Sequence, residues 1–190
     1  TNSLLAYISA VVFGTGIGCF RSYLISNPAN IHKMPKDKSF SEMATLPVAY
    51  NTVIHSYNYA KLKKGDSILI HSGAGGVGIT AIQIAQQIGA KVFATCSDSK
   101  RKYLEKYQIK ISSSRDSEQF KKDVENEEFD VVLNCLTDNF IQYSVDKLKK
   151  GGSFIELGKR GILSKDQMVD YNYLIVDLDT FTTDFKYQIK

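Results

Sequence analysis

The feature that most constrains this chain is a glycine-rich turn between two patterned segments. The apolar run S-I-L-I at 67–70 leads into H-S-G-A-G-G-V-G at 71–78, and an amphipathic segment follows to residue 88. Gly73, Gly75 and Gly78 satisfy G-x-G-x-x-G, and a second apolar run begins at Lys91. A strand, this turn, a helix and a second strand together indicate a dinucleotide-binding unit. The alternative is a strand-to-helix turn that uses glycine for geometry alone.

Each glycine of the motif has an expected role. Gly73 should permit the tight turn, Gly75 should let a pyrophosphate approach the backbone, and Gly78 should let the helix pack close to the strand. The amides at the helix start, with the helix dipole behind them, suit a phosphate. The candidate phosphate-binding residues are therefore Gly73, Ala74, Gly75, Gly76, Val77 and Gly78.

The segments around this unit alternate between strand and helix patterns. The expected strands are 67–72, 91–95, 109–112, 129–134, 153–157 and 173–178, and the expected helices are 77–88, 99–106, 116–126 and 139–149. Upstream, S-F-S-E at 39–42 is a capping box, and a helical pattern follows it to residue 60 with a break at Pro47. Apolar strands that alternate with helices predict an α/β fold, a Rossmann-type doubly wound parallel sheet.

Composition narrows the class of partner. The chain has 190 residues, 43% of them hydrophobic, and a formal net charge of +4, which is too mild to favour nucleic acid and suits an anionic small molecule. The three cysteines lie far apart without metal-ligand spacing, so we expect no zinc and no disulfide framework. With no signal peptide or long apolar run in the sequence, we expect a cytoplasmic protein that does not enter a membrane.

The residues after the second strand bear on cofactor choice. This strand ends in F-A-T-C, and S-D-S-K-R-K follows at 97–102. Asp98 has the spacing of an acid that binds the ribose 2′-OH of NAD, but we prefer a role as the N-cap of the next helix. Lys100 and Arg101 supply cations for a 2′-phosphate, which favours NADP over NAD. Their alternative role is a solvated helix face.

Several motifs resemble one family. The segment from Leu62 to Thr95 looks like the zinc-free, quinone-reductase-like branch of the medium-chain dehydrogenase/reductase superfamily. The pieces S-S-R-D at 113–116, F-D-V-V-L-N-C-L at 129–136 and G-G-S-F-I-E-L-G-K at 151–159 are similar to enoyl reductase domains of type I polyketide and animal-type fatty acid synthases. S-F-S-E-M-A-T-L-P-V at 39–48 also resembles that family, so the likeness covers nearly the whole chain.

The resemblance implies a reaction. Such domains use NADPH to reduce a trans-2-enoyl thioester carried on the phosphopantetheine arm of an acyl carrier protein, with hydride going to the β-carbon. It also implies two catalytic residues, Lys159 at the end of E-L-G-K and Asp177 in I-V-D-L-D. An ammonium can stabilise the developing enolate, and a lysine or an acid can give the α-proton. The alternative is a surface lysine and an aspartate that closes a turn.

The resemblance also implies further cofactor contacts. Thr52 would lie near the nicotinamide ribose, and Arg115 near the adenosine phosphate unless it is only an exposed loop residue. The ends of the second, fourth and fifth strands complete the expected cofactor edge with Ser97, Asn134, Leu136, Leu157 and Gly158. Cys135 stands where the family usually has serine, and we expect it to be a small core residue and no nucleophile.

The likeness also predicts how the chain is divided. We expect residues 1–45 to be the remnant of a β-rich, GroES-like barrel that binds substrate, and residues 46–190 to be a C-terminally incomplete NADP-binding domain. Taken alone, such a fragment should be inactive. Its expected partners are the carrier protein and the other domains of the synthase, with homodimer formation left open.

Two other functions remain open at this stage. One is a free-standing NADPH quinone or enone reductase, for which the S-S-R-D and E-L-G-K pieces would be accidental. The other is a cofactor-binding module without turnover. The motifs do not distinguish a fatty acid synthase from a polyketide synthase.

Overall fold

The computed structural model describes residues 11–16 and 18–176. These residues fall into two compact units, and the division lies within helix α2 (Leu46–Ala60), between Asn51 and Thr52. Among the described residues, none of the helices is both long enough and apolar enough to cross a membrane.

The N-terminal unit is small and contains a two-stranded antiparallel sheet. Strand β1 (Val12–Gly14) pairs with β2 (Ile31–Lys33), and the short 3₁₀ helix η2 (Pro28–Asn30) precedes β2. Helix α1 (Phe40–Ala44) begins at the capping box expected from the sequence. The backbone amide of Glu42 donates to the Ser39 hydroxyl, and the Ser39 amide donates to the Glu42 carboxylate. The antiparallel pair agrees with the predicted β-rich character of this segment.

The larger unit, Thr52–Val176, is built on a six-stranded parallel sheet. Its strands in spatial order are β5 (Lys110–Ser113), β4 (Lys91–Cys96), β3 (Ser67–Ile70), β6 (Phe129–Asn134), β7 (Leu148–Glu156) and β8 (Asn172–Ile175). β3, the first strand of this sheet along the chain, lies in the middle, and the order reverses between β3 and β6. This arrangement is the Rossmann order, which confirms the predicted fold class.

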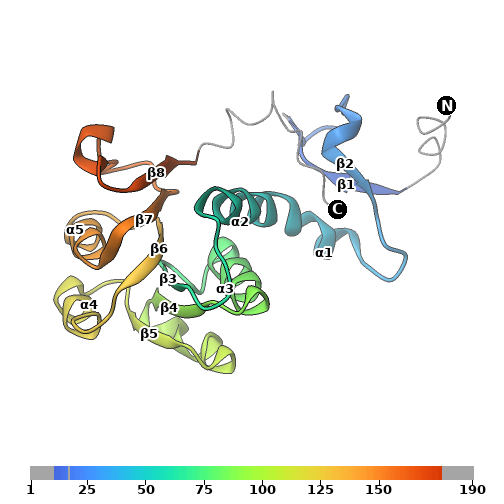
Figure 1. The fold of residues 1–190 in the computed structure, drawn as a ribbon. Coiled ribbons are helices and arrows are strands. Elements are labelled where there is room, and N and C mark those ends of the chain that lie inside the picture. Colours follow the sequence, from blue (N-terminus) through green and yellow to red (C-terminus); the bar gives the residue numbers. More distant parts are fainter. Residues whose placement is uncertain (1–10, 17, 177–190) are drawn as a thin grey trace. The chain divides into compact units, whose positions relative to one another are not determined.

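Helices cover both faces of this sheet. Figure 1 shows α3 (Gly76–Ile88) on one face, and α4 (Ser117–Asp123) with α5 (Asn139–Asp146) on the other. Helix α3 ends at Gly89, whose φ of 87° is the left-handed conformation that closes a helix at low cost for glycine. The C-terminal half of α2 packs on α3, where the Tyr57 hydroxyl donates to the Ala81 carbonyl at 2.8 Å.

Three expected helices differ in the structure, and one of them, expected at 116–126, begins at Ser117 and ends at Asp123. The segment predicted as a helix at 99–106 forms the 3₁₀ turns η3 (Asp98–Tyr103) and η4 (Glu105–Tyr107). The helix expected at 139–149 ends at Asp146, because the chain already enters β7 at Leu148. A further 3₁₀ turn, η5 (Lys165–Met168), precedes β8.

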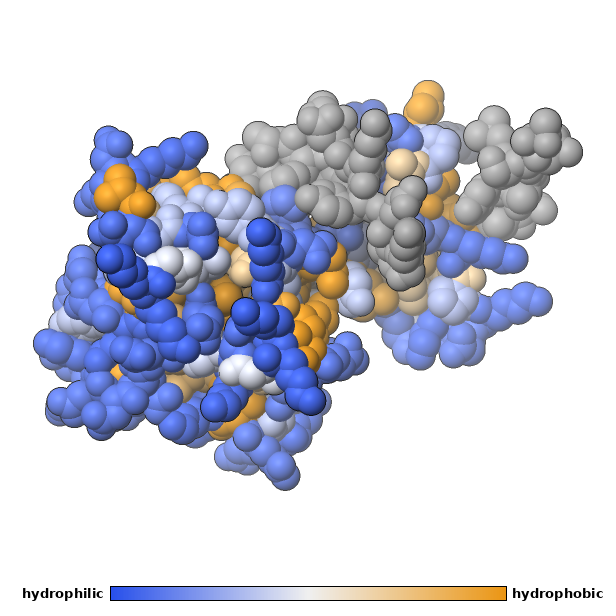
Figure 2. Space-filling view, viewed as in Figure 1, coloured by the Kyte–Doolittle hydropathy of each residue, from blue (hydrophilic) through white to orange (hydrophobic). Residues whose placement is uncertain are grey.

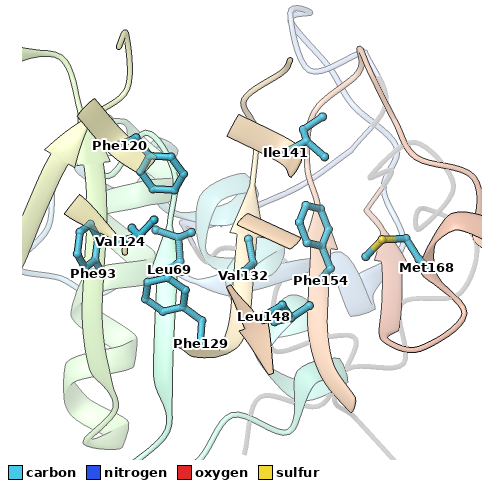
Figure 3. Close-up of a cluster of buried hydrophobic side chains, with 10 residues drawn as sticks. All are labelled: Leu69, Phe93, Phe120, Val124, Phe129, Val132, Ile141, Leu148, Phe154 and Met168. Atoms are coloured by element: carbon cyan, nitrogen blue, oxygen red, sulfur yellow. The ribbon is translucent and has the colours of Figure 1, made fainter. Parts of the chain in front are cut away.

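The core shows why the strands pair in this register. Leu69 lies opposite Phe93 on one side and Val132 on the other, and Val132 lies opposite Phe154. Side chains alternate between the faces of a sheet, so this row shares the face under α4 and α5. It packs there with Phe120, Val124, Phe129, Ile141, Leu148 and Met168 (Figure 3). In Figure 2, the visible face of this unit is mostly hydrophilic, with small hydrophobic patches.

Candidate functional site

The glycine turn lies at the carboxyl end of β3, beside the point where the strand order reverses. Ser72 has a φ of 54°, the left-handed region that non-glycine residues rarely adopt. The Gly73 amide then donates to the Thr95 carbonyl at 2.7 Å, and the Gly75 amide donates to the Ser72 carbonyl at 2.9 Å. The left-handed residue of the turn is therefore Ser72, whereas Gly73 has no positive φ.

Gly73 and Gly78 are needed because other atoms lie close to them. A Cβ on Gly73 would lie 2.9 Å from the Cβ of Ala94, and one on Gly78 would lie 2.4 Å from the Ser72 carbonyl oxygen. Both distances are too short for a side chain. Gly78 therefore lets α3 approach the end of β3, as expected from the motif.

The start of α3 is open and uncapped. Gly75 is the N-cap residue and makes no side-chain capping bond, and a Cβ on Gly76 would meet nothing within 4 Å. The first amides of a helix have no partners within the helix, so they can donate to an anion. This arrangement fits the phosphates of a dinucleotide against the turn formed by Ala74, Gly75, Gly76 and Val77.

Beneath the turn lies a buried network of neutral groups. The His71 side chain is 3% exposed; its Nδ1 lies 3.1 Å from the Thr95 hydroxyl, and its Nε2 lies 2.8 Å from the Ser144 hydroxyl. Ser144 donates its proton to the Phe140 carbonyl at 2.6 Å, so it must accept from Nε2–H of the histidine. Nδ1 then accepts from Thr95, whose oxygen in turn accepts from the Ser72 amide at 3.2 Å.

Burial fixes the charge of this histidine. It lowers the pKa of His71 from 6.5 to about 3, so the ring is neutral near neutral pH. The network therefore holds the Ser72 amide without placing a charge beneath the expected phosphate site. The half-buried Cys135 thiol donates to the His71 carbonyl at 3.7 Å, and burial raises the pKa of that thiol, which agrees with a structural role for Cys135.

The cationic segment follows β4 at the same edge of the sheet. Ser97 is the N-cap residue of η3, so the prediction that Asp98 caps this element was wrong; Asp98 is the first residue inside it. Lys100 and Arg101 are both exposed. Arg101 uses one nitrogen to donate to the Ile111 carbonyl at 3.2 Å, whereas Lys100 makes no side-chain hydrogen bond to the residues that the structure describes.

The S-S-R-D loop lies next to this segment, at the end of β5. The Ser113 hydroxyl accepts from the amides of Arg115 and Asp116, at 3.1 and 3.0 Å, and the Ser114 amide donates to the Cys96 carbonyl at 2.9 Å. Asp116 caps α4 through its carboxylate. The loop is therefore a defined turn joined to the end of β4, and it carries the exposed Arg115.

The ends of β6 and β7 form a second buried polar cluster. The Asn134 side chain donates to the Leu136 carbonyl and accepts from the Leu136 amide, at 3.0 and 3.1 Å. It also donates to the Glu156 carboxylate at 2.7 Å, and the other oxygen of this carboxylate accepts from the Gly158 amide at 2.5 Å. Burial raises the pKa of Glu156, while both hydrogen bonds oppose that rise. Leu157 joins the strands through its amide, which donates to the Asn134 carbonyl at 2.8 Å.

The three remaining residues expected in the site differ in their surroundings or lie outside the described part of the chain. Lys159 is exposed and lies three residues beyond the end of β7, directly after the Glu156 cluster. Thr52 is buried in α2 at 5% exposure. Asp177 lies outside the described residues, so its role stays a prediction.

Sequence reasoning missed His71, Thr95, Ser144 and Glu156 as parts of the site. One signal was present for two of them, since His71 and Glu156 are polar residues placed directly after apolar strand residues. Such a position at the carboxyl end of a buried strand is where this fold holds its ligands.

Comparisons with known proteins agree with this geometry. Residues 76–183 match the zinc-binding dehydrogenase family. The chain is 37% identical to the nucleotide-binding subdomain of the enoyl reductase domain of PpsC from Mycobacterium tuberculosis, with a TM-score of 0.63, over 70% of this chain and 81% of that one. It is 39% identical to the CurK enoyl reductase, with a TM-score of 0.76, over 83% of this chain and 50% of that one.

A curated relative places this likeness in a larger protein. The chain is 38% identical to the spectinabilin polyketide synthase system protein NorB from Streptomyces orinoci, over 80% of this chain. The match spans about 7% of the length of that relative. The chain therefore belongs to the zinc-binding dehydrogenase family of the medium-chain dehydrogenase/reductase superfamily, and within it to the enoyl reductase domains of polyketide synthases.

The name of the family raises the question of zinc. Within residues 11–16 and 18–176, no group of three or more His, Cys, Asp or Glu side chains is arranged to hold a metal ion. A zinc site needs three or four such ligands around one point. The described site therefore does not fit zinc.

Proposed function

We propose that this chain is part of an NADPH-dependent reductase that acts on a trans-2-enoyl thioester. The observation that carries the proposal is the open, uncapped start of α3 at the switch point of the sheet, in a chain of the enoyl reductase family. Bound NADPH would supply the hydride for the β-carbon of the substrate. The residues of this chain would hold the cofactor and stabilise the charge that develops on the substrate.

The cofactor would lie along the carboxyl edge of the sheet. The amides at the start of α3 would bind the pyrophosphate, because they are unpaired within the helix and lie at its positive end. Lys100 would bind the 2′-phosphate from the segment after β4, together with Ser97 and Arg101, and Arg115 would approach from the neighbouring loop. Asn134, Leu136, Leu157 and Gly158 would line the edge further along, with Thr52 on α2.

Lys159 would act on the substrate. Its ammonium group would stabilise negative charge on the thioester oxygen when the β-carbon accepts hydride. Lys159 or Asp177 would then give a proton to the α-carbon. The position of Lys159, exposed and three residues beyond β7, supports this role, because it lies at the carboxyl edge where this fold holds its ligands.

We further propose that the substrate arrives on the phosphopantetheine arm of an acyl carrier protein. The curated relatives support this proposal, because the matched segments belong to much longer synthases. The other domains of such a synthase would then be the structural partners of this chain. The division into a substrate-domain remnant at 1–45 and a nucleotide-binding domain at 46–190 is part of the same proposal.

The test is a direct assay on the complete protein. NADPH oxidation is followed with a trans-2-enoyl thioester, with the matching saturated thioester as the blank, and with a quinone in place of the thioester. We expect turnover with the enoyl thioester and NADPH, and much slower turnover with NADH or the quinone. Faster turnover of the quinone would instead favour a quinone reductase. Cofactor binding without turnover of either substrate would favour a binding module.

A further inference from the structure

Glu156 is the one fully buried carboxylate among the residues that the structure describes. It is the last residue of β7 and has 0% exposure, although charged side chains are rarely buried without a specific reason. The role proposed for E-L-G-K uses its last three residues and leaves the glutamate without one. Its position at the carboxyl edge places it directly before the segment that carries Lys159.

The contacts of Glu156 are directed at that segment. One carboxylate oxygen accepts from the Gly158 amide at 2.5 Å, and the other accepts from the Asn134 side chain at 2.7 Å. Asn134 is itself held by two hydrogen bonds with the backbone of Leu136. The carboxylate therefore joins the chain that leaves β6 to the chain that leaves β7.

Gly158 lies directly against this carboxylate. A Cβ at residue 158 would lie 2.6 Å from Oε1 of Glu156, so a larger residue would displace that oxygen from its present position. The next residue is Lys159. Any change that displaces the Glu156 carboxylate therefore removes a hydrogen bond from the backbone one residue before the proposed catalytic lysine.

We propose that Glu156 is a positioning residue of the reduction, and that its buried carboxylate holds the Gly158 amide so that Lys159 is directed at the substrate. This inference rests on the role proposed for Lys159. It predicts that Glu156 affects turnover through Lys159 far more than it affects NADPH affinity. Its partners Asn134 and Gly158 lie on the part of the proposed cofactor edge away from the phosphates, and its side-chain hydrogen bonds include none with the glycine turn.

The test compares substitutions in the complete protein. Glu156→Gln keeps the shape of the side chain but replaces one carboxylate oxygen with an NH₂ group. That group cannot accept a hydrogen bond, so either the Asn134 side chain or the Gly158 amide loses its acceptor. We expect kcat for the enoyl thioester to fall about tenfold or more, with less than a threefold change in the NADPH Kd. Glu156→Asp, which keeps the charge, should restore part of kcat. Phe129→Leu, at the opposite end of β6, is the control for a general loss of core stability and should keep kcat.

The decisive measurement is a double-mutant cycle. In a Lys159→Ala background, Glu156→Gln should lower kcat less than twofold, because the residue through which it acts is already absent. An equal loss in both backgrounds would overturn the inference while leaving the role of Lys159 intact. Normal turnover in Lys159→Ala alone would overturn the proposed role of Lys159 itself.

A second variant covers the case in which Glu156→Gln does not fold. Gly158→Ala disturbs the same contact from the other partner, and it should give the same loss of kcat and the same dependence on Lys159. If neither variant folds, Glu156 is a determinant of the fold, and its proposed role in positioning Lys159 is wrong.

Discussion

The carboxyl edge of the sheet is built in two different ways at its two halves. At β3 and β4, a neutral His71–Thr95–Ser144 network holds the backbone of the glycine turn. At β6 and β7, a buried carboxylate holds the backbone before Lys159. Under the proposed function, the difference suits what each half would bind, because a phosphate would be repelled by a carboxylate beneath it and attracted by unpaired amides. One half would then be suited to cofactor affinity and the other to catalysis.

The largest effect that separates the two halves should come from Lys159→Ala. Losing one electrostatic stabiliser of a developing oxyanion typically costs ~10²–10³ in rate. We expect turnover of the enoyl thioester to fall by that factor in the complete protein, with the NADPH Kd close to normal. Steady-state kinetics and a cofactor titration measure both quantities.

The opposite pattern would break the comparison. If Lys159→Ala weakened NADPH binding and left turnover at saturation intact, Lys159 would be a cofactor anchor. The α-proton would then have to come from another group or from water.

An Asp177→Asn variant tests the residue proposed to act with Lys159. The double variant should be little slower than the slower single one, because residues that act as a unit are not additive.

Within the first half, Gly78 and Gly76 should behave in opposite ways. Gly78→Ala brings a Cβ against the Ser72 carbonyl, so we expect a loss of ~1–3 kcal/mol in the free energy of unfolding. Gly76→Ala enters open space at the first position of α3, so stability should be equal or ~0.4–1 kcal/mol higher. Chemical denaturation without cofactor measures the difference.

Cofactor binding should then show whether the open space at Gly76 is part of the proposed binding site. Gly76→Ala places a methyl group where the pyrophosphate is expected, so NADPH should bind ~10-fold more weakly in spite of the unchanged fold. A Gly76→Ala variant with normal stability and normal NADPH affinity would remove the start of α3 from the proposed site. Gly65→Ala would be a poor control for Gly76→Ala, because Gly65 has a φ of 90°, a conformation in which alanine is strained.

Lys100 should set the choice between NADPH and NADH. A charge-assisted hydrogen bond contributes ~1.5–3 kcal/mol, so Lys100→Ala should reduce the preference for NADPH by ~10–100-fold and leave NADH affinity nearly unchanged. Fluorescence titration with each cofactor measures this change. Lys102→Ala, on the same 3₁₀ turn, is the matched control and should have little effect. Equal affinity for both cofactors in the unsubstituted protein would return Asp98 to consideration as a ribose ligand.

Local pattern was sufficient to predict the fold. The strand–helix alternation after Ser67, the glycine motif and the capping box at Ser39 each depend on residues close in sequence, and all three are present in the structure. The helix predicted at 99–106 was wrong, and the reason lies in tertiary packing. Leu104 is fully buried near Gly73, and Gln108 ends the segment in the left-handed conformation, so packing has overridden the helical propensity of its lysines.

The site was only partly predictable because its hydrogen bonds join distant residues. His71 meets Ser144 across 73 positions, and Glu156 meets Asn134 across 22. No periodicity or spacing rule links such pairs. Sequence alone could place polar residues at strand ends, but it could not show that one cluster is neutral and the other carries a buried carboxylate.

The last of these effects concerns acid stability and tests the neutral half directly. The pKa of His71 is lowered to about 3 in the fold, against 6.5 for an unperturbed histidine. Between these values, the unfolded chain binds a proton that the folded chain does not. The free energy of unfolding should therefore fall as pH falls from about 6.5 towards 3, by at most ~1.4 kcal/mol per pH unit from this residue.

A His71→Gln variant should lose that contribution to the slope, although its stability at neutral pH will also be lower because the network is broken. The exposed His32→Gln is the matched control and should keep the slope of the unsubstituted protein. His55, whose pKa is also lowered by burial, contributes to the slope in all three proteins and cancels in the comparison. Chemical denaturation at a series of pH values measures the slopes. If His71→Gln kept the full slope, His71 would be charged in the fold, and the neutral state assigned to this half of the edge would be wrong.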